Sequence, residues 1–386
     1  MPRRIFDFLS SLKLTVTCLS LAIILVFVGT LAQVDSGIYE VQRRYFQSLV
    51  VWWPATPGAF SLPVFPGGHL LGAVLLLNLV AAHARRFRWT WKKFGIHLTH
   101  AGLIILLVGG LFTDLFSVES FLRLAPGETK NYSEDPRAVE LAVIDGSDSG
   151  FDQVAAIPES RLRRGGTIGH GSLPFRIIVR RFYQNSRFQP IGEAARDAAP
   201  AATRGPGSQI AVFEVPRATA MNERDLQSAV IEIVPASDPR QSLGTWLVSG
   251  QLGAPQTVSC EGKTWRLAMR PARYYKPYSL TLRKFSHERY PGTEIPKNFA
   301  SHAVLTDPEH QENRDVLISM NHPLRYRGDT YFQSGFEKGD TATILQVVYN
   351  PGFIAPYVAC AVVGTGLLYQ FALHFAGFLN RRKTTP

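Results

Sequence analysis

The chain has 386 residues, of which 46% are hydrophobic, and it carries a formal net charge of +11. This excess is concentrated: eleven Lys and Arg and a single acid flank the long apolar segments, which leaves 30 basic and 29 acidic residues elsewhere. The nearly neutral remainder argues against a nucleic-acid partner, which would require a basic face. The three cysteines form no C-x-x-C pair, which argues against thiol–disulfide exchange.

Four segments, residues 14–32, 68–84, 94–115 and 353–379, are long and apolar enough to cross a bilayer as helices. The first of them could instead be a cleaved signal peptide. Its apolar core is longer than that of a usual signal peptide, so an uncleaved membrane anchor is favoured. Because the number of spans is even, both ends of the chain lie on the same side of the membrane.

The basic residues beside the spans predict which side this is. They are Arg3, Arg4, Lys13, Arg85, Arg86, Arg88, Lys92, Lys93, Arg381, Arg382 and Lys383, against the single acid Asp7. Short loops rich in Lys and Arg stay in the cytoplasm. Both termini and the link between the second and third spans are therefore predicted to be cytoplasmic.

The longest segment between spans predicts a β-rich domain. Alternating or β-branched runs predict strands at residues 139–144, 175–182, 210–215, 230–234, 280–285 and 344–349. Residues 257–260 and 264–269, on either side of a Glu-Gly-Lys turn, predict a hairpin. The fold class is then a membrane protein with four transmembrane α-helices and a large extracytoplasmic β-rich domain inserted between helices 3 and 4.

The predicted division of the chain follows from these elements. Residues 1–32 form the cytoplasmic N-terminus and first span, 33–67 an external loop, and 68–116 the second and third spans with their basic link. Residues 117–352 form the extracytoplasmic domain, and 353–386 form the fourth span and a cytoplasmic tail.

A weak internal repeat runs through the predicted β-rich domain. The stretch that begins at Leu173 (LPFRIIVRRFYQNSRF) aligns with the one that begins at Lys276 (KPYSLTLRKFSHERY), at an offset of 103 residues. Both have Pro and an aromatic residue, an alternating strand, and then two basic residues and Phe. Duplication of a β unit would give this pattern, and so would two similar edge strands.

Histidines gather where the second and third spans meet the basic link. His83 ends the second span, and His97 and His100 begin the third. An imidazole inside a bilayer is costly and usually serves a ligand, a proton or a partner group. The alternative is that these side chains only anchor helix ends at the membrane surface or bond to a neighbouring helix, which is the favoured interpretation for His374. His69 begins the second span on the outer side and is expected at the interface.

The remaining histidines show no spacing typical of a zinc site. His170, His287, His302 and His310 are expected on the solvated surface, and His322 in a turn. The chain also has no phosphate loop, nucleophile elbow or H-E-x-x-H motif, so no catalytic motif is present.

Several motifs resemble those of ResB-type cytochrome c biogenesis proteins. In the spans these are Gly29-Thr30-Leu31-Ala32-Gln33, Phe65-Pro66-Gly67-Gly68, Asn78-Leu79, His100-Ala101-Gly102-Leu103-Ile104 and Gly109-Gly110. Near the C-terminus they are Asn298-Phe299-Ala300-Ser301, Met320-Asn321-His322-Pro323-Leu324, Arg325-Tyr326-Arg327-Gly328, Tyr331-Phe332-Gln333-Ser334 and Asn350-Pro351-Gly352. The resemblance covers both ends of the chain well and the middle of the exported segment poorly.

The resemblance implies a subunit that handles haem b in transit across the bacterial inner (cytoplasmic) membrane and delivers it to apocytochrome c. It implies a ResC/CcsA-type membrane protein as the partner, because this chain lacks the tryptophan-rich haem-handling loop of such proteins. The family's third-span histidine corresponds to His100, a tentative ligand of the haem iron, with His97 and His83 as further haem-binding candidates. The chain is at most part of a cytochrome c haem-lyase complex.

His97 and His100 share one face of a helix, and axial haem ligands must approach from opposite faces. A second ligand would therefore come from another helix or from the partner. Three other functions remain open. The chain could be a scaffold that binds no haem and whose β domain docks the partner or apocytochrome. A di-haem electron-transfer subunit would need histidine pairs at several depths, and a small-solute transporter would show broken helices.

Overall fold

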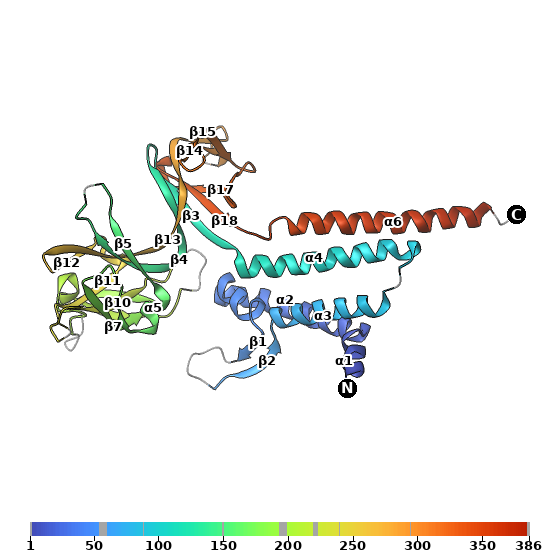
Figure 1. Ribbon diagram of the computed structural model, residues 1–386, viewed down its shortest axis with the longest axis horizontal. Helices are drawn as coiled ribbons and strands as arrows, with labels where there is room; N and C mark the ends of the chain where they lie inside the picture. The colour runs from blue at the N-terminus through green and yellow to red at the C-terminus, as the bar shows by residue number, and fades with distance from the viewer. Residues whose placement is uncertain are drawn as a thin grey trace. The chain divides into compact units, whose positions relative to one another are not determined.

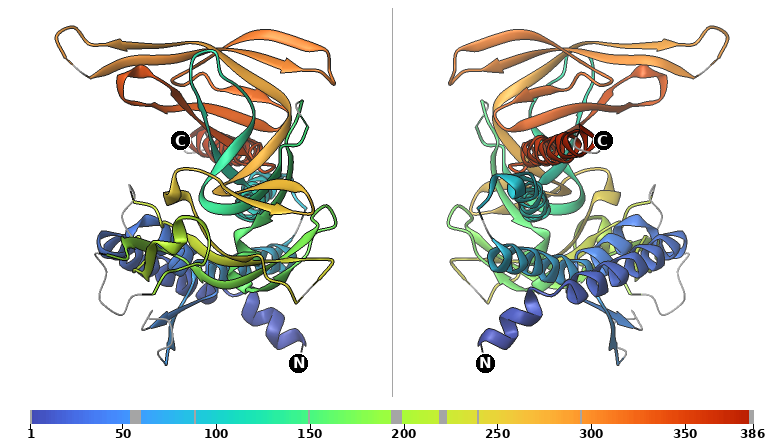
Figure 2. Two further views of the ribbon diagram at one scale, coloured as in Figure 1. Left: turned by 90° about the vertical axis from the view of Figure 1, so that its left-hand side faces the viewer. Right: turned by 90° about the vertical axis from the view of Figure 1, so that its right-hand side faces the viewer.

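The computed structural model describes residues 2–53, 60–87, 89–148, 150–192, 199–218, 223–238, 240–293 and 295–383 (Figure 1). They divide into two compact units. The helical unit is formed by the chain up to residue 118 and from residue 349 onward, and the β unit by residues between them. Figure 2 shows the elements of both units from two further directions.

The helical unit contains the four predicted spans. Its elements are α1 (Pro2–Leu9), α2 (Leu12–Val41), the π-helix η1 (Gln42–Phe46), β1 (Val50–Trp53), β2 (Leu62–Pro66), α3 (Gly68–Arg86), the 3₁₀ turn η2 (Trp91–Lys93), α4 (Phe94–Phe116) and α6 (Ala355–Lys383). Helices α2, α3, α4 and α6 are each long and apolar enough to cross a membrane. The four helices that the sequence predicted as candidate membrane spans are therefore present in the structure.

Helix α2 continues beyond Ala32, where the sequence placed the end of the first span. It changes direction at Gly37, whose φ of 72° and ψ of 159° are not helical. Glycine adopts such a positive φ without steric cost. The chain after Gly37 returns beside α2, so that a Cβ at Gly29 would lie 2.8 Å from Cζ of Phe46. Residues 33–46, the first part of the segment expected to be an external loop, are thus helical.

A polar contact ties the start of the helical unit together. The buried Asn78 on α3 donates from Nδ2 to the carbonyl oxygens of Leu9 (2.6 Å) and Ser11 (3.1 Å). Its Oδ1 accepts a hydrogen bond of 2.6 Å from Thr15 on α2. Asn78 therefore bonds to carbonyls on both sides of the α1–α2 junction, which fixes α1 and α2 against α3.

Helices α4 and α6 pack through small residues. Gly95, Gly102 and Gly109 recur every seven residues on α4 and are all buried. A Cβ at Gly95 would lie 2.5 Å from the carbonyl oxygen of Gly366, and one at Gly109 would clash with the Cβ of Ala355. Small residues let helix backbones approach closely in a membrane, where no hydrophobic force drives helices together.

The β unit follows α4 and precedes α6 along the chain. It contains β3 (Val118–Leu124), β4 (Thr129–Asp145), β5 (Gln153–Pro158), α5 (Glu159–Arg164), β6 (Gly166–Ile168), β7 (Phe175–Tyr183), β8 (Ser186–Pro190), β9 (Ile210–Glu214), β10 (Ser228–Pro235), β11 (Gly244–Ser249), β12 (Gln256–Cys260), β13 (Lys263–Arg289), β14 (Pro296–Asp307), β15 (Glu312–Ser319), β16 (Leu324–Tyr326), β17 (Asp329–Phe336) and β18 (Thr343–Tyr349). Every predicted strand coincides with one of these, which confirms the large β-rich domain.

The β unit has two large hydrophobic cores, to both of which β13 contributes, and a smaller cluster that includes Tyr183 and Leu247. A ten-stranded sheet contains the path β15-β14-β13-β4-β3-β18-β17-β16, and a four-stranded sheet has the order β11-β10-β7-β6. The first core lies where the four-stranded sheet faces β4, β5, β12 and the first half of β13, and includes Ile177 and Leu267. The second includes Leu280 from the second half of β13 and Leu345 from β18.

The predicted hairpin is formed by β12 and β13. Cys260 pairs with Lys263, so Glu261 and Gly262 are the two turn residues. Their φ values of 51° and 75° are those of a type I′ turn, which matches the twist of antiparallel strands.

The two halves of the internal repeat occupy equivalent places in the two cores. Strand β7 pairs with β10, which pairs with β11, and the β8–β9 hairpin is inserted in the chain between β7 and β10. The second half of β13 likewise pairs with β14, which pairs with β15. Each first strand carries an extra residue against its partner, Arg180 in β7 and Arg283 in β13. These arginines are separated by the same 103 residues as the repeat. A shared bulge at a shared position favours duplication over two unrelated edge strands, because bulges persist within families.

Candidate functional site

The structure brings together the three histidines selected from the sequence. His83 ends α3, and its ring centroid lies 5.1 Å from that of His97 and 5.6 Å from that of His100, both on α4. All three are half-buried. Helices α3 and α4 are antiparallel and joined by the basic link, so the end of one and the start of the other meet at the same level. The three imidazoles therefore converge from two helices.

Aromatic side chains of the link cover this histidine cluster. The ring of Phe87 lies 4.8 Å from His97, and the indole of Trp89 stacks on His97 with an interplanar angle of 2° at 6.5 Å. Flat apolar rings beside imidazole nitrogens are suited to a planar ligand that binds through a metal. Within the described part of the chain, no ring contact joins His374 to these histidines. His374 lies on α6, where its Nε2 is 3.1 Å from Nε2 of Gln370.

A second histidine site lies at the opposite end of the helices. His69 at the start of α3 places Nε2 2.6 Å from Oδ2 of Asp114 near the end of α4. Gln47 donates to the other carboxylate oxygen, Oδ1, at 2.9 Å. Gln47 and Asp114 also line a cavity of about 710 Å³ whose other walls come from α4 and the start of α6. A carboxylate that accepts from one ring nitrogen fixes the orientation of a histidine and leaves the other nitrogen available.

The sequence contained one signal for this second site. Asp114 is the sole acid within α4, and an ionisable residue in a span marks a functional site by default. His69 alone looked interfacial, because its carboxylate partner lies 45 residues later in the chain.

His287 does not lie on the solvated surface, contrary to the expectation from the sequence. Its side chain is 3% exposed, and Nδ1 lies 2.9 Å from Oδ1 of Asp340. The ring of Phe336 is 4.3 Å away, and that of Phe299 is 6.5 Å away. Strands β14 and β17 therefore cover the histidine, and this burial depends on pairings that are distant in sequence.

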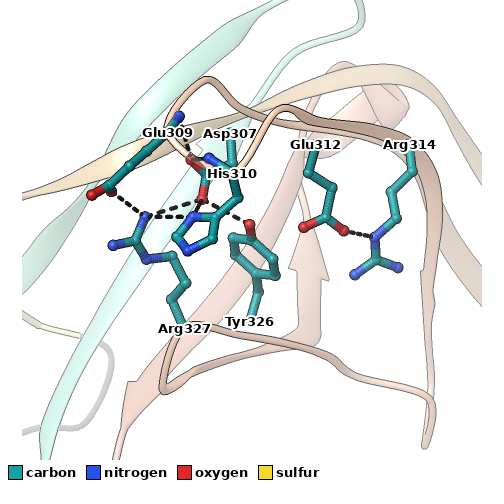
Figure 3. Close-up of polar contacts among 7 residues, drawn as sticks. All are labelled: Asp307, Glu309, His310, Glu312, Arg314, Tyr326 and Arg327. Atoms are coloured by element: carbon teal, nitrogen blue, oxygen red, sulfur yellow. Dashed lines mark hydrogen bonds and ion pairs between the residues drawn. The ribbon is translucent and has the colours of Figure 1, made fainter.

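An acidic cluster in the β unit has the spacing of a cation site. Ligand atoms of Asp307, Glu309 and His310 lie within 4.8 Å of one another (Figure 3). Nη1 of Arg327 already lies 3.1 Å from Asp307 Oδ2 and 2.7 Å from Glu309 Oε2. The guanidinium neutralises the carboxylates at the place where a cation would bind, so this cluster is better explained as a structural clasp.

The same clasp sets the protonation of Asp307. Burial would raise the pKa of its carboxyl, but hydrogen bonds from Tyr326, Arg327 and His310 hold that pKa well below its usual range. Tyr326 donates at 2.7 Å, and burial together with this carboxylate raises the pKa of Tyr326. The buried carboxylate of Asp307 thereby joins the β14–β15 turn to the β16–β17 turn.

Comparison with known proteins agrees with the resemblance found in the sequence. Residues 245–362, from β11 into α6, match the model of the ResB-like family. The chain is similar to Protein NrfI of Wolinella succinogenes, with 35% identity over 104 residues. These residues are 27% of this chain. The matched segment spans 12% of the length of that relative. The predicted resemblance to ResB-type proteins is therefore confirmed for the C-terminal part of the β unit and the start of α6.

Proposed function

Since residues 245–362 are ResB-like, we propose that this chain is a ResB-type subunit of cytochrome c biogenesis in the bacterial inner membrane. It helps haem b to cross the bilayer and presents it to apocytochrome c together with a ResC/CcsA-type partner. The basic residues beside the spans support cytoplasmic termini and an extracytoplasmic β unit.

The convergence of His83, His97 and His100 is the observation that best supports haem handling. Three imidazoles held close together inside a membrane protein are costly unless they bind something. His100 is proposed as a ligand of the haem iron at the cytoplasmic side, with His83 or a partner residue opposite it. Histidine ligation tunes the potential of the iron, and so would help to keep the cargo reduced.

The pair of His69 and Asp114 is proposed as the exit end of the same route. The adjacent cavity of about 710 Å³ lies within the usual volume range of cofactor sites. Asp114 would orient His69 so that Nδ1 faces the cargo. The two sites lie at opposite ends of the antiparallel helices α3 and α4, as transfer across a membrane requires.

The test is a haem absorption spectrum of the purified chain, with and without its partner. We expect alanine at His83, His97 and His100 together to lower retained haem about tenfold or more and to abolish cytochrome c maturation. His374→Ala is the matched control, because it removes an exposed intramembrane imidazole outside the cluster. Unchanged haem content and maturation in the triple variant would refute the site and favour the scaffold function.

A further inference from the structure

A narrow cavity lies where the chain folds back on α2. Ile24, Leu25 and Val28 of α2 form one wall, and strands β1 and β2 form the other. The complete lining is Ile24, Leu25, Val28, Arg44, Tyr45, Val51, Trp53, Val64 and Phe65, which we call the α2 slot. Its volume is about 240 Å³, and every wall is aliphatic or aromatic except at Arg44.

The α2 slot lies in the half of the bilayer away from the basic link. Ile24 and Val28 follow the start of α2 at Leu12 by 12 and 16 residues, or roughly 18 to 24 Å at 1.5 Å per residue. The hydrocarbon core is roughly 30 Å thick, so both residues lie in its second half. The slot is therefore at the depth of the acyl chains and headgroups of that leaflet.

Arg44 is the polar group of this otherwise apolar slot. Its Nη2 donates to the carbonyl oxygen of Trp52 at 3.0 Å. In the described part of the chain, no ion pair joins Arg44 to a carboxylate, whereas the adjacent Arg43 pairs with Glu40 at 2.8 Å. A guanidinium at this depth without an anion is costly, and a phosphate is an anion that matches its geometry.

The strand pair beside the slot exposes large apolar side chains. Trp52 and Trp53 are 50% and 64% exposed, and Leu62 and Val64 are more than half exposed. Figures 1 and 2 both show β1 and β2 on the side of α2 and α3 that faces away from α4. Tryptophans in such a position are typical of the membrane interface.

We propose that the α2 slot binds a membrane phospholipid, with one acyl chain between α2 and the β1–β2 pair and the phosphate on Arg44. The slot is narrow and apolar, as a single hydrocarbon chain requires, and its one cation stands at the level of the headgroups. The lipid would hold β1 and β2 against α2 and would neutralise Arg44. This proposal does not depend on haem binding.

The test uses the full chain in vesicles of phosphatidylethanolamine and phosphatidylglycerol that contain phosphatidylglycerol with a photoactivatable acyl chain. After illumination, mass spectrometry identifies the labelled peptides. We expect label on α2 and on β1 or β2. Val28→Trp should fill the slot and abolish this label. Arg44→Gln should raise the probe fraction needed for half-maximal labelling about tenfold, as expected for one lost charge-assisted hydrogen bond.

Arg43→Gln is the matched control, since it removes the same charge from the adjacent, more exposed position, and its labelling should equal that of the original chain. Circular dichroism of each variant checks that the helices still form. Unchanged labelling in Val28→Trp would overturn the proposal, as would an equal loss in Arg43→Gln. A further outcome would also overturn the proposal. If the label is lost when the partner subunit binds, and Trp53 cross-links to that partner, the slot is part of a subunit interface.

Discussion

At the scale of single residues, Asp307 shows how the β unit uses a buried charge. Its side chain is fully buried, yet it accepts hydrogen bonds from Tyr326, Arg327 and His310. A carboxylate that is bonded in this way stabilises the fold only while it is ionised. The ResB-like motif around Arg325 to Gly328 thus contributes both a turn and a counter-charge.

The lowered pKa of Asp307 gives a prediction with a definite sign. Because the folded-state pKa lies below the unfolded value of about 3.9, the stabilisation is complete above about pH 4 and declines as the pH falls toward the folded-state pKa. We expect Asp307→Asn to lower the melting temperature of the purified full chain by several degrees at pH 7. The difference from the original chain should narrow below pH 4.

Asp315→Asn is the control for this measurement, because that side chain is 76% exposed in its contact with Arg283. Exposed ion pairs contribute little to stability. Equal melting of the two variants at pH 7 would contradict the role assigned to Asp307.

The sequence predicted single residues well where their surroundings are local. His83, His97 and His100 could be grouped because a short link joins two antiparallel spans, and this brings their ends together. The partner of His69 lies 45 residues away, and the cover over His287 comes from β14 and β17. Neither of these environments follows from local periodicity, which reports only which face of an element is apolar.

At the scale of elements, the glycine face of α4 determines how closely α6 can approach. Gly109 meets Ala355, whereas a Cβ at the neighbouring Gly110 would meet nothing within 4 Å. We expect Gly109→Leu to force α4 and α6 apart and to destabilise the helical unit by about 1–3 kcal/mol. Gly110→Leu should change stability by less than about 0.5 kcal/mol.

Denaturant unfolding in detergent, followed by circular dichroism, measures both glycine variants. The comparison is sharp because the two substitutions are chemically identical and adjacent in the chain. Equal destabilisation by Gly110→Leu would contradict the packing explanation, because helix propensity favours leucine over glycine at both positions.

The repeated β element shows what a sequence offset can and cannot reveal. The alternation of apolar residues from Phe175 and from Tyr278 predicted two similar strands. That each strand begins a row of three antiparallel strands and bulges at Arg180 or Arg283 depends on hydrogen-bond register, which the residues alone leave open. The sequence therefore predicted that both strands exist, but not which strands they pair with.

At the scale of the whole molecule, the spans followed from hydropathy, because about twenty apolar residues are needed to cross a bilayer. The order of strands in the ten-stranded sheet did not follow, since β3 neighbours β18 from the other end of the unit. Such pairings are set by the sum of many contacts between distant segments. The turn-back after Gly37 was also missed, because glycine near a helix end is compatible with several conformations.

The charge bias leads to a topology prediction for the whole chain. We expect protease added to spheroplasts to cleave within residues 119–348, while a C-terminal tag stays protected until the membrane is opened. Immunoblotting of the tagged fragment reads out both results. Cleavage of the tag in intact spheroplasts would reverse the assigned orientation.

Strand β13 is 27 residues long and contributes to both large cores of the β unit, and β4 pairs with it between Trp265 and Thr281. Ion pairs such as Arg270–Glu140 and Arg273–Glu134 lock the two strands together along the way. Strand β13 thus connects the two large cores by continuous strand backbone. We therefore expect the two large cores to move as one body when a molecule binds at either end of β13.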